Sequence, residues 1–354
     1  MKPTVLPFLI YTLFISLTLH AQKTDKIPLT INDFAQWEVL SNPLVSSDGK
    51  MVAFEINPQK GNGNLVVKPI DSKKEDSLSR GFDARFSPES DFIVYKIKQP
   101  EDSIRSAKKK KLKKEQMPKD SLGILVFKHH KIYTYPNLKQ YTIPKENARW
   151  VAFLTDMKKP EKKPEGEKGA DEPKAKKSSD SPNDTKNQLV LFHAASGDTL
   201  CFQNVTEYYC APLGHSITFI RQTKDSLDRS EVVVFDTDKR KTTSFFKQPG
   251  TVKKITSDQQ GGRFGFLFST DTIKEKVYSL YYGSLTTGEP NAVVVPDAQG
   301  LPLGWSPSEF SDLTFSENGQ YLFFGTNRKP RAEPKDTLLE DEKPVLDKIG
   351  RAHV

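Results

Sequence analysis

Short apolar segments recur along the chain, each preceded by a polar turn. The three clearest copies carry a Ser, then turn residues such as Pro, Asp, Asn or Gly, then an apolar run, and they occupy residues 45–54, 86–95 and 315–324. Short polar residues and glycine accept the backbone angles of tight turns, whereas β-branched and aromatic residues favour strands. Each copy therefore predicts a hairpin in which a turn leads into a strand.

Two further sets of segments fill the intervals between these copies. We call the pattern of Ser, turn residues and apolar run the turn phrase. Weaker versions of the turn phrase lie at residues 147–154, 213–220 and 257–268. An apolar strand followed by a polar turn lies at residues 65–70, 131–135, 188–193, 231–236 and 278–282. Where no insert intervenes, the turn phrases are about 40 residues apart, as expected for one four-stranded blade per repeat. The pattern predicts an all-β protein, a β-propeller with about six blades visible and its ring incomplete.

One stretch near the N-terminus departs from this strand pattern. Between Thr30 and Leu40, the side chains of Phe34, Trp37 and Leu40 fall on one helical face. Thr30 can act as the N-cap, with Asp33 at the third position of the helix. We expect a short helix here, before the propeller begins.

The first residues have the layout of a secretory signal peptide. Lys2 gives a positive start, residues 5–19 are largely apolar, and a small residue, Ala21, precedes the expected cleavage site. The apolar run is shorter than the roughly 20 residues that a membrane span needs. We therefore expect residues 1–21 to be removed from an exported protein, periplasmic or extracellular, with no membrane span.

The remaining chain divides by composition. We expect an N-terminal segment with the short helix at 22–43 and the propeller at 44–348. Two Lys-rich inserts interrupt the repeat at residues 105–119 and 158–186. They contribute most of the excess in the net charge of +8, so this charge does not indicate nucleic-acid binding. We interpret both inserts as disordered, solvated loops; the alternative is a polybasic contact with acidic sugars or anionic surfaces.

The chain has two cysteines, Cys201 and Cys210. Their spacing is too wide for a zinc knuckle, and there is no second cysteine pair. In an exported protein they could form one disulfide. The alternative is two buried free thiols, and the sequence leaves both open.

The start of the mature chain resembles that of a known enzyme family. Residues 28–37 run Pro-Leu-Thr-Ile-Asn-Asp-Phe to a Trp, and the first turn phrase follows at 45–54. This order is similar to the opening of secreted prolyl oligopeptidase-family serine peptidases of Bacteroidetes-like bacteria. The resemblance implies a propeller followed by an α/β-hydrolase domain. In that family the propeller limits entry to peptides and the hydrolase domain carries the Ser, Asp and His.

The chain itself lacks the catalytic motif that this resemblance would require. A Gly-x-Ser-x-Gly elbow is absent, and the nearest match, around Ser306, ends in Ser and precedes a turn phrase, so we interpret Ser306 as a loop residue. The histidines outside the signal peptide are His129, His130, His193, His215 and His353. None of them has a nucleophile-elbow serine that it could activate. Metal-binding His spacing and phosphate-binding Gly loops are also absent. We predict no catalytic, cofactor or metal residues.

The last residues indicate why the motif is missing. Residues 349–354 look like the translation of a sequencing adapter, so we expect the natural reading frame to continue beyond Lys348. The predicted function is then that of a propeller that docks a peptide substrate and controls its entry. This propeller alone is expected to be inactive, and a catalytic domain encoded downstream is expected to cut the peptide.

Two other functions stay open at this level. The chain could be a stand-alone envelope propeller that binds a protein or a polysaccharide, since the fold alone does not choose. It could also be a propeller hydrolase that uses carboxylates such as Asp225, Asp228 and Glu231 in its central channel. Charged residues beside strands are usually solvated loop ends, which disfavours the last alternative.

Overall fold

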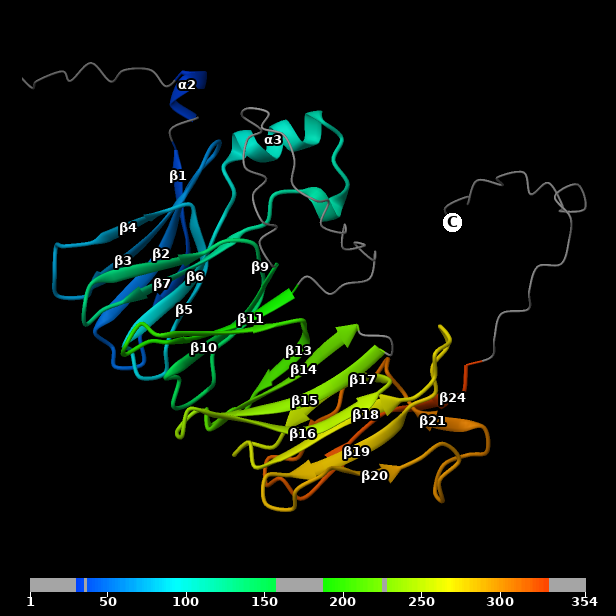
Figure 1. Cartoon of the computed structure of the whole chain (residues 1–354). Helices are drawn as coiled ribbons and strands as arrows, with labels where there is room; N and C mark the ends of the chain where they lie inside the picture. Colours follow the sequence, from blue (N-terminus) through cyan, green and yellow to red (C-terminus); the bar gives the residue numbers. More distant parts are fainter. Residues whose placement is uncertain (1–29, 35–36, 157–186, 225–227, 331–354) are drawn as a thin grey trace, which may run out of the picture.

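The computed structural model describes residues 30–34, 37–156, 187–224 and 228–330, and nearly all of this part is β-structure. Five four-stranded antiparallel sheets follow one another along the chain, and in each the strands pair in sequence order. Figure 1 shows them fanned in a curved row from the blue N-terminal end to the orange C-terminal end. This is the blade arrangement of a β-propeller, and it confirms the predicted fold class.

Each sheet is a simple meander. The first contains β1 (Glu38–Val45), β2 (Met51–Pro58), β3 (Asn64–Pro69) and β4 (Asp76–Ser79). The second contains β5 (Gly81–Phe86), β6 (Phe92–Ile97), β7 (Ser121–Val126) and β8 (Lys131–Tyr135). The third contains β9 (Leu138–Thr142), β10 (Trp150–Asp156), β11 (Asn187–His193) and β12 (Thr199–Gln203).

The C-terminal half continues the pattern and then becomes less regular. The fourth sheet contains β13 (Val205–Cys210), β14 (Ser216–Lys224), β15 (Asp228–Asp236) and β16 (Lys241–Pro249). The fifth contains β17 (Thr251–Ser257), β18 (Arg263–Ser269), β19 (Ser279–Ser284) and β20 (Asn291–Val294). Beyond it, β21 (Trp305–Pro307) pairs with β24 (Thr326–Arg328), and β22 (Thr314–Phe315) pairs with β23 (Leu322–Phe323). These two small sheets stand where the sequence predicts a sixth blade.

The predicted turn phrases form the hairpins between the first two strands. In each clear copy, a Ser donates its backbone N–H to the carbonyl five residues on: 2.9 Å from Ser46 to Met51, 2.9 Å from Ser87 to Phe92 and 2.8 Å from Ser316 to Tyr321. The Ser46 hydroxyl oxygen also accepts the Met51 N–H at 2.9 Å, which closes the turn a second time. Two weaker copies make the same backbone bond, from Ala211 to Ser216 and from Asp258 to Arg263.

Apolar side chains fill the space between successive sheets. Successive residues of β6 point to opposite faces of the second sheet. Ile93 packs against the first sheet, and Phe92 packs against the third. Trp150 and Phe235 are buried between the third and fourth sheets. Each fully buried Phe or Leu contributes about 1.5–3 kcal/mol, so these layers supply most of the stabilisation.

The short N-terminal helix is smaller than the sequence predicts. α2 spans only Ile31–Phe34, and the Asp33 carboxylate accepts the Thr30 backbone N–H at 2.5 Å, as expected of the capping pair. The predicted continuation to Leu40 is wrong, because residues from 38 onward form β1 and pair with β2. The hydrogen bonds of a sheet edge outweigh a helical pattern of three apolar residues.

The first Lys-rich insert is also partly ordered, contrary to the prediction. It includes the second half of α3 (Glu101–Lys109) and the 3₁₀ turn η1 (Lys114–Gln116), and Ala107 is buried. The second insert, the predicted signal peptide and residues 349–354 lie outside the described residues. Within the part that the structure describes, no helix is long and apolar enough to cross a membrane.

The meander gives the protein two distinct sides. Turns between the first and second strands, and between the third and fourth, lie at one end of every sheet, which we call the turn side. Connections between the second and third strands lie at the opposite end, the insert side, which carries α3. The first strands of neighbouring sheets, such as β13 and β17, lie beside one another and form the inner surface.

Candidate functional site

The described histidines all lie on the turn side. His129 and His130 are in the β7–β8 turn, His193 ends β11, and His215 is in the β13–β14 turn. His353 lies outside the described residues. The four described histidines are therefore separate residues at the turn side of three sheets.

His193 nevertheless belongs to a group of contacting Ser, His and Asp side chains. Its Nδ1 is 2.8 Å from the Ser196 hydroxyl, which is 2.6 Å from Asp198 Oδ2. The carboxylate can only accept, so the Ser196 hydroxyl donates its proton to Asp198, and the Ser196 backbone N–H donates to His193 Nδ1 at 3.3 Å. In a catalytic triad the imidazole instead accepts the serine proton, and the carboxylate holds the imidazole. The order is inverted here, and the three residues form a turn.

The surroundings of His193 reinforce this conclusion. Burial, and then the positive charge of Arg240, lower the pKa of the imidazole, while the hydrogen bond from Ser196 lowers the pKa of the Asp198 carboxyl. Arg240 places an Nη2 atom 3.3 Å from His193 Nε2 and lies 5.6 Å from the centre of the Trp150 ring. The imidazole is thus held neutral between a cation and a hydroxyl.

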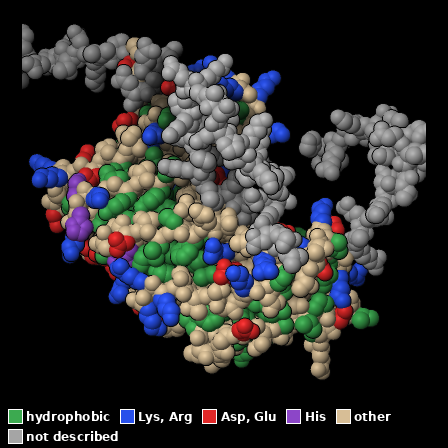
Figure 2. All heavy atoms as spheres, in the orientation of Figure 1, with side chains coloured by type: hydrophobic (Ala, Val, Ile, Leu, Met, Phe, Trp, Pro, Cys, Tyr) green, Lys and Arg blue, Asp and Glu red, His purple; other side chains and the backbone are tan. Residues whose placement is uncertain are grey.

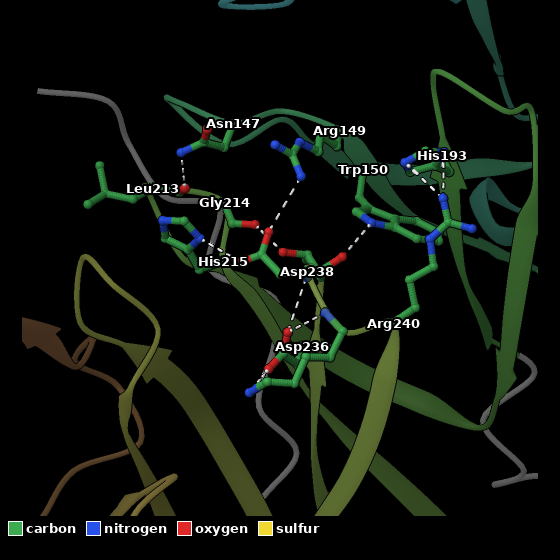
Figure 3. A network of polar contacts seen from close by, with 12 residues as sticks. Asn147, Arg149, Trp150, His193, Leu213, Gly214, His215, Asp236, Asp238 and Arg240 are labelled. Carbon is green, nitrogen blue, oxygen red and sulfur yellow. Dashed lines mark hydrogen bonds and ion pairs between the residues drawn. The ribbon is translucent and has the colours of Figure 1, made fainter.

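The same contacts extend across the junction of the third and fourth sheets (Figure 3). Trp150 donates its indole N–H to the Thr237 carbonyl at 3.3 Å. Asp238 binds His215 Nδ1 at 2.9 Å and Arg149 at 3.6 Å. All these partners belong to turns of adjacent sheets, so the network joins the two sheets at their edges.

Ser306 is placed differently from the prediction. It lies in the short strand β21 and is buried, 4% exposed, rather than in an exposed loop. Its strand pairs with β24 and is followed by no helix in the described part of the chain. It therefore lacks the strand–turn–helix setting of a nucleophile elbow.

Both cysteines are free thiols. Cys201 is exposed on β12, the last strand of the third sheet, and Cys210 is buried on β13, the first strand of the fourth. Burial raises the pKa of the Cys210 thiol, which keeps it protonated. Partial desolvation of the Cys201 sulfur raises the pKa of that thiol as well.

Of the carboxylates considered for a channel site, the two that the structure describes do not line the inner surface. Asp225 lies outside the described residues, Asp228 is exposed at the start of β15, and Glu231 pairs with Arg221 at 3.4 Å. β15 is the third strand of its sheet, two strands away from the inner surface. Among the described residues, no group of three or more His, Cys, Asp or Glu side chains is placed to hold a metal ion.

The inner surface does contain a polar cavity, which we call the inner cavity. Its volume is about 440 Å³, and first strands of three sheets and the segment before β22 supply its walls. The lining residues are Gln140, Thr206, Glu207, Tyr208, Tyr209, Lys254, Ile255, Asp312, Leu313 and Thr314. They come from positions more than 170 residues apart, so only the fold brings them together.

Lys254 is the central residue of this cavity. Its backbone has φ of +58°, in the left-handed region, at an irregularity in the pairing of β17 with β18. Its N–H donates to Glu207 Oε2 at 2.8 Å, and its Nζ binds Asp312 at 2.8 Å. That ammonium group lowers the pKa of the Asp312 carboxyl. A bulge of this kind aims a side chain away from the sheet, here into the cavity.

The first and second sheets meet in a related way. Glu55, only 5% exposed, accepts the N–H of Asp83 at 3.0 Å, and Asp83 also has a positive φ, of 47°. The Asp83 side chain then pairs with Lys96 at 2.8 Å. In both places a Glu of one sheet fixes a bulge of the next and orients a charged side chain. The sequence gives no signal of this device, because neither bulge contains Gly.

The cavity combines hydrogen-bonding and charged groups. Thr, Tyr, Gln, Lys and carboxylate side chains line it, and among the described lining residues there is no Ser, Cys or His. Thr206 Oγ1 is shielded from solvent and has no hydrogen-bond partner among the described residues. A buried hydroxyl without a partner costs free energy.

Comparison with known proteins adds the following. No protein-family model and no curated protein matches the chain. Among solved structures, the β-propeller domain of the Trilobed protease from Pyrococcus furiosus is similar over 79% of this chain and 75% of its own, with 9% identity and a TM-score of 0.37. An acylaminoacyl peptidase from Pyrococcus horikoshii is similar over 82% of this chain, with 11% identity and a TM-score of 0.39.

Other similar structures belong to different protein classes. An oligogalacturonate lyase in complex with manganese is similar over 81% of this chain and 73% of its own, with 13% identity and a TM-score of 0.41. This chain spans only 43% of the acylaminoacyl peptidase. At these sequence identities and TM-scores, the similarity concerns the fold and does not indicate an activity.

Proposed function

We propose that this chain is a docking propeller that binds extended peptide segments in its inner cavity and passes them to a peptidase domain, without cleaving them itself. The observation that carries the proposal is the composition of the cavity: hydrogen-bonding and charged groups converge there, without a Ser, Cys or His among the described lining residues. The resemblance of residues 28–37 and 45–54 to prolyl oligopeptidase-family peptidases supports the connection to peptidases.

The cavity suits a peptide backbone. An extended peptide presents N–H and C=O groups that ordinary hydrogen-bonding side chains can satisfy. The Gln140 side chain can donate to a carbonyl or accept from an N–H group. Lys254 and Glu207 add a donor and an acceptor of opposite charge.

Peptide binding to the full chain tests the proposal. The probe is an end-blocked, fluorescein-labelled ten-residue peptide of Gly, Ser and Pro, followed by fluorescence anisotropy. Hydrogen bonds to charged groups contribute about 1.5–3 kcal/mol, so Lys254→Met and Glu207→Gln should each weaken binding at least about tenfold. Lys247→Met is the matched control, because Lys247 is exposed on the outer strand β16.

Three results would contradict the proposal. Equal affinity in Lys254→Met and Lys247→Met would place the peptide elsewhere. Hydrolysis of the peptide by the purified chain, blocked by a serine-directed inhibitor, would show that it is not a docking module only. Binding of a polysaccharide or a folded protein, without binding of the peptide, would favour the envelope-propeller alternative.

We further propose that the protein is exported. Lys2, the apolar run at 5–19 and Ala21 support this. Expression of the full chain in a Gram-negative host, with fractionation and mass spectrometry, should give periplasmic protein beginning at Gln22. Protein that keeps Met1 and stays in the cytoplasm would contradict export.

A further inference from the structure

The end of α3 presents an unusual concentration of positive charge. Six lysines lie between Lys108 and Lys114, and all six are exposed. None forms an ion pair with another described residue. Figure 2 shows the blue Lys and Arg side chains gathered where Figure 1 places α3, on the insert side of the molecule.

Lysines elsewhere on the protein behave differently. Lys96, Lys139 and Lys254 pair with carboxylates at 2.7–2.8 Å. Their charge is balanced within the fold, whereas the charge at the end of α3 has no counterpart in the described part of the chain. An unbalanced cluster is attracted to anions outside the protein.

The cluster is also held in a defined shape. Leu112 donates its backbone N–H to the Ala107 carbonyl at 3.2 Å, which is the bond pattern of a helix C-terminus closed by a left-handed residue. That residue is Lys111, with φ of +51°. Glycine is preferred at this position because it has no steric cost there. A lysine in its place adds charge at some expense of local strain.

The arrangement favours one kind of anion. The lysines surround a protruding helix end and do not line a cleft, so they fit a broad surface better than a single chain. Leu112, 38% exposed, lies among them and can enter the boundary of a lipid layer. Aromatic rings, which would stack on sugars, are absent from residues 101–119. We propose that the end of α3 binds the anionic headgroups of a phospholipid membrane and holds the propeller at its surface.

Vesicle binding by the full chain tests this proposal. Large vesicles of phosphatidylcholine with 30% phosphatidylglycerol are compared with pure phosphatidylcholine by co-sedimentation, at low and high NaCl. A basic residue near an anionic surface changes partition about fivefold, so Lys108→Gln/Lys110→Gln/Lys113→Gln should lower partition about 100-fold. Leu112→Gln should lower it less and leave the salt dependence unchanged.

The control has the same change in net charge. Lys73→Gln/Lys74→Gln/Lys247→Gln removes three exposed lysines that lie away from α3. It should keep most of the binding to anionic vesicles. Equal losses in the two triple variants, or no preference for anionic vesicles, would overturn the proposal. Tighter binding to a soluble anionic polysaccharide or an acidic peptide, at equal anion concentration, would overturn its assignment to lipid.

Discussion

The surfaces between sheets and the inner surface are built from opposite kinds of side chain. Between sheets, fully buried Phe, Leu, Ile and Val side chains pack in continuous layers. On the inner surface, carboxylates fix the bulges at Asp83 and Lys254, whose charged side chains form ion pairs with neighbouring segments. The comparison teaches that stability and binding depend on different parts of this fold. The apolar layers between sheets hold the sheets together, and the first strands can present polar side chains on the inner surface.

The largest effect should come from opening a layer between sheets. Phe235 is fully buried, and its ring lies 5.0 Å from Trp150 in an edge-to-face contact. Phe235→Ala should therefore cost about 3–5 kcal/mol of unfolding free energy. Urea denaturation measures it. Phe323→Ala, at a site that is 59% exposed, is the control and should cost less than about 1 kcal/mol.

An intermediate effect is expected where a carboxylate fixes a bulge. Glu55 accepts three hydrogen bonds, from the backbone of Asp83 and the side chains of Asn42 and Asn57. Glu55→Ala leaves these donors without their acceptor and should cost about 1–3 kcal/mol. The exposed Glu75→Ala is the control. If both substitutions cost the same, the carboxylate does not organise this junction.

The smallest effect on the free energy of unfolding is expected at the ion pairs of Asp156, and it should depend on pH. Burial alone would raise the pKa of the Asp156 carboxyl, but the hydrogen bonds and charges of Lys119 and Lys139 outweigh it and lower the pKa below its ordinary value. A depressed pKa in the folded state stabilises the protein above the unfolded value of about 4, and this stabilisation is lost as the pH falls through the folded-state pKa.

Asp156→Asn should accordingly cost about 1 kcal/mol at pH 7 and almost nothing near pH 2. Urea midpoints at the two pH values measure the difference. The exposed Asp71→Asn should change neither midpoint. A constant cost of Asp156→Asn across this range would mean that the ion pairs do not stabilise the fold.

The repeated hairpins could be predicted because they are local. Ser46 and Met51 are five residues apart, and the turn residues between them determine the bond that joins them. α3 could not be predicted in this way, because a run of lysines indicates a loop by composition. What orders it is the burial of Ala107 and the left-handed closure at Lys111, neither of which local sequence reveals.

The inner cavity could be predicted even less. Gln140, Glu207, Lys254 and Asp312 meet only because successive sheets place their first strands together. Lys254 adopts a backbone conformation that lysine seldom takes, so no sequence rule points to it. The sequence instead draws attention to Asp228 and Glu231, which the fold leaves on a third strand.

Photo-crosslinking tests the central claim most directly. An end-blocked peptide of Gly, Ser and Pro with one benzoylphenylalanine is irradiated with the full chain, and the labelled residues are identified by mass spectrometry. We predict saturable labelling of β13, β17 and the segment before β22, competed by unlabelled peptide. Labelling confined to the turn-side network around His193 and Arg240, or to α3, would contradict peptide docking in the inner cavity.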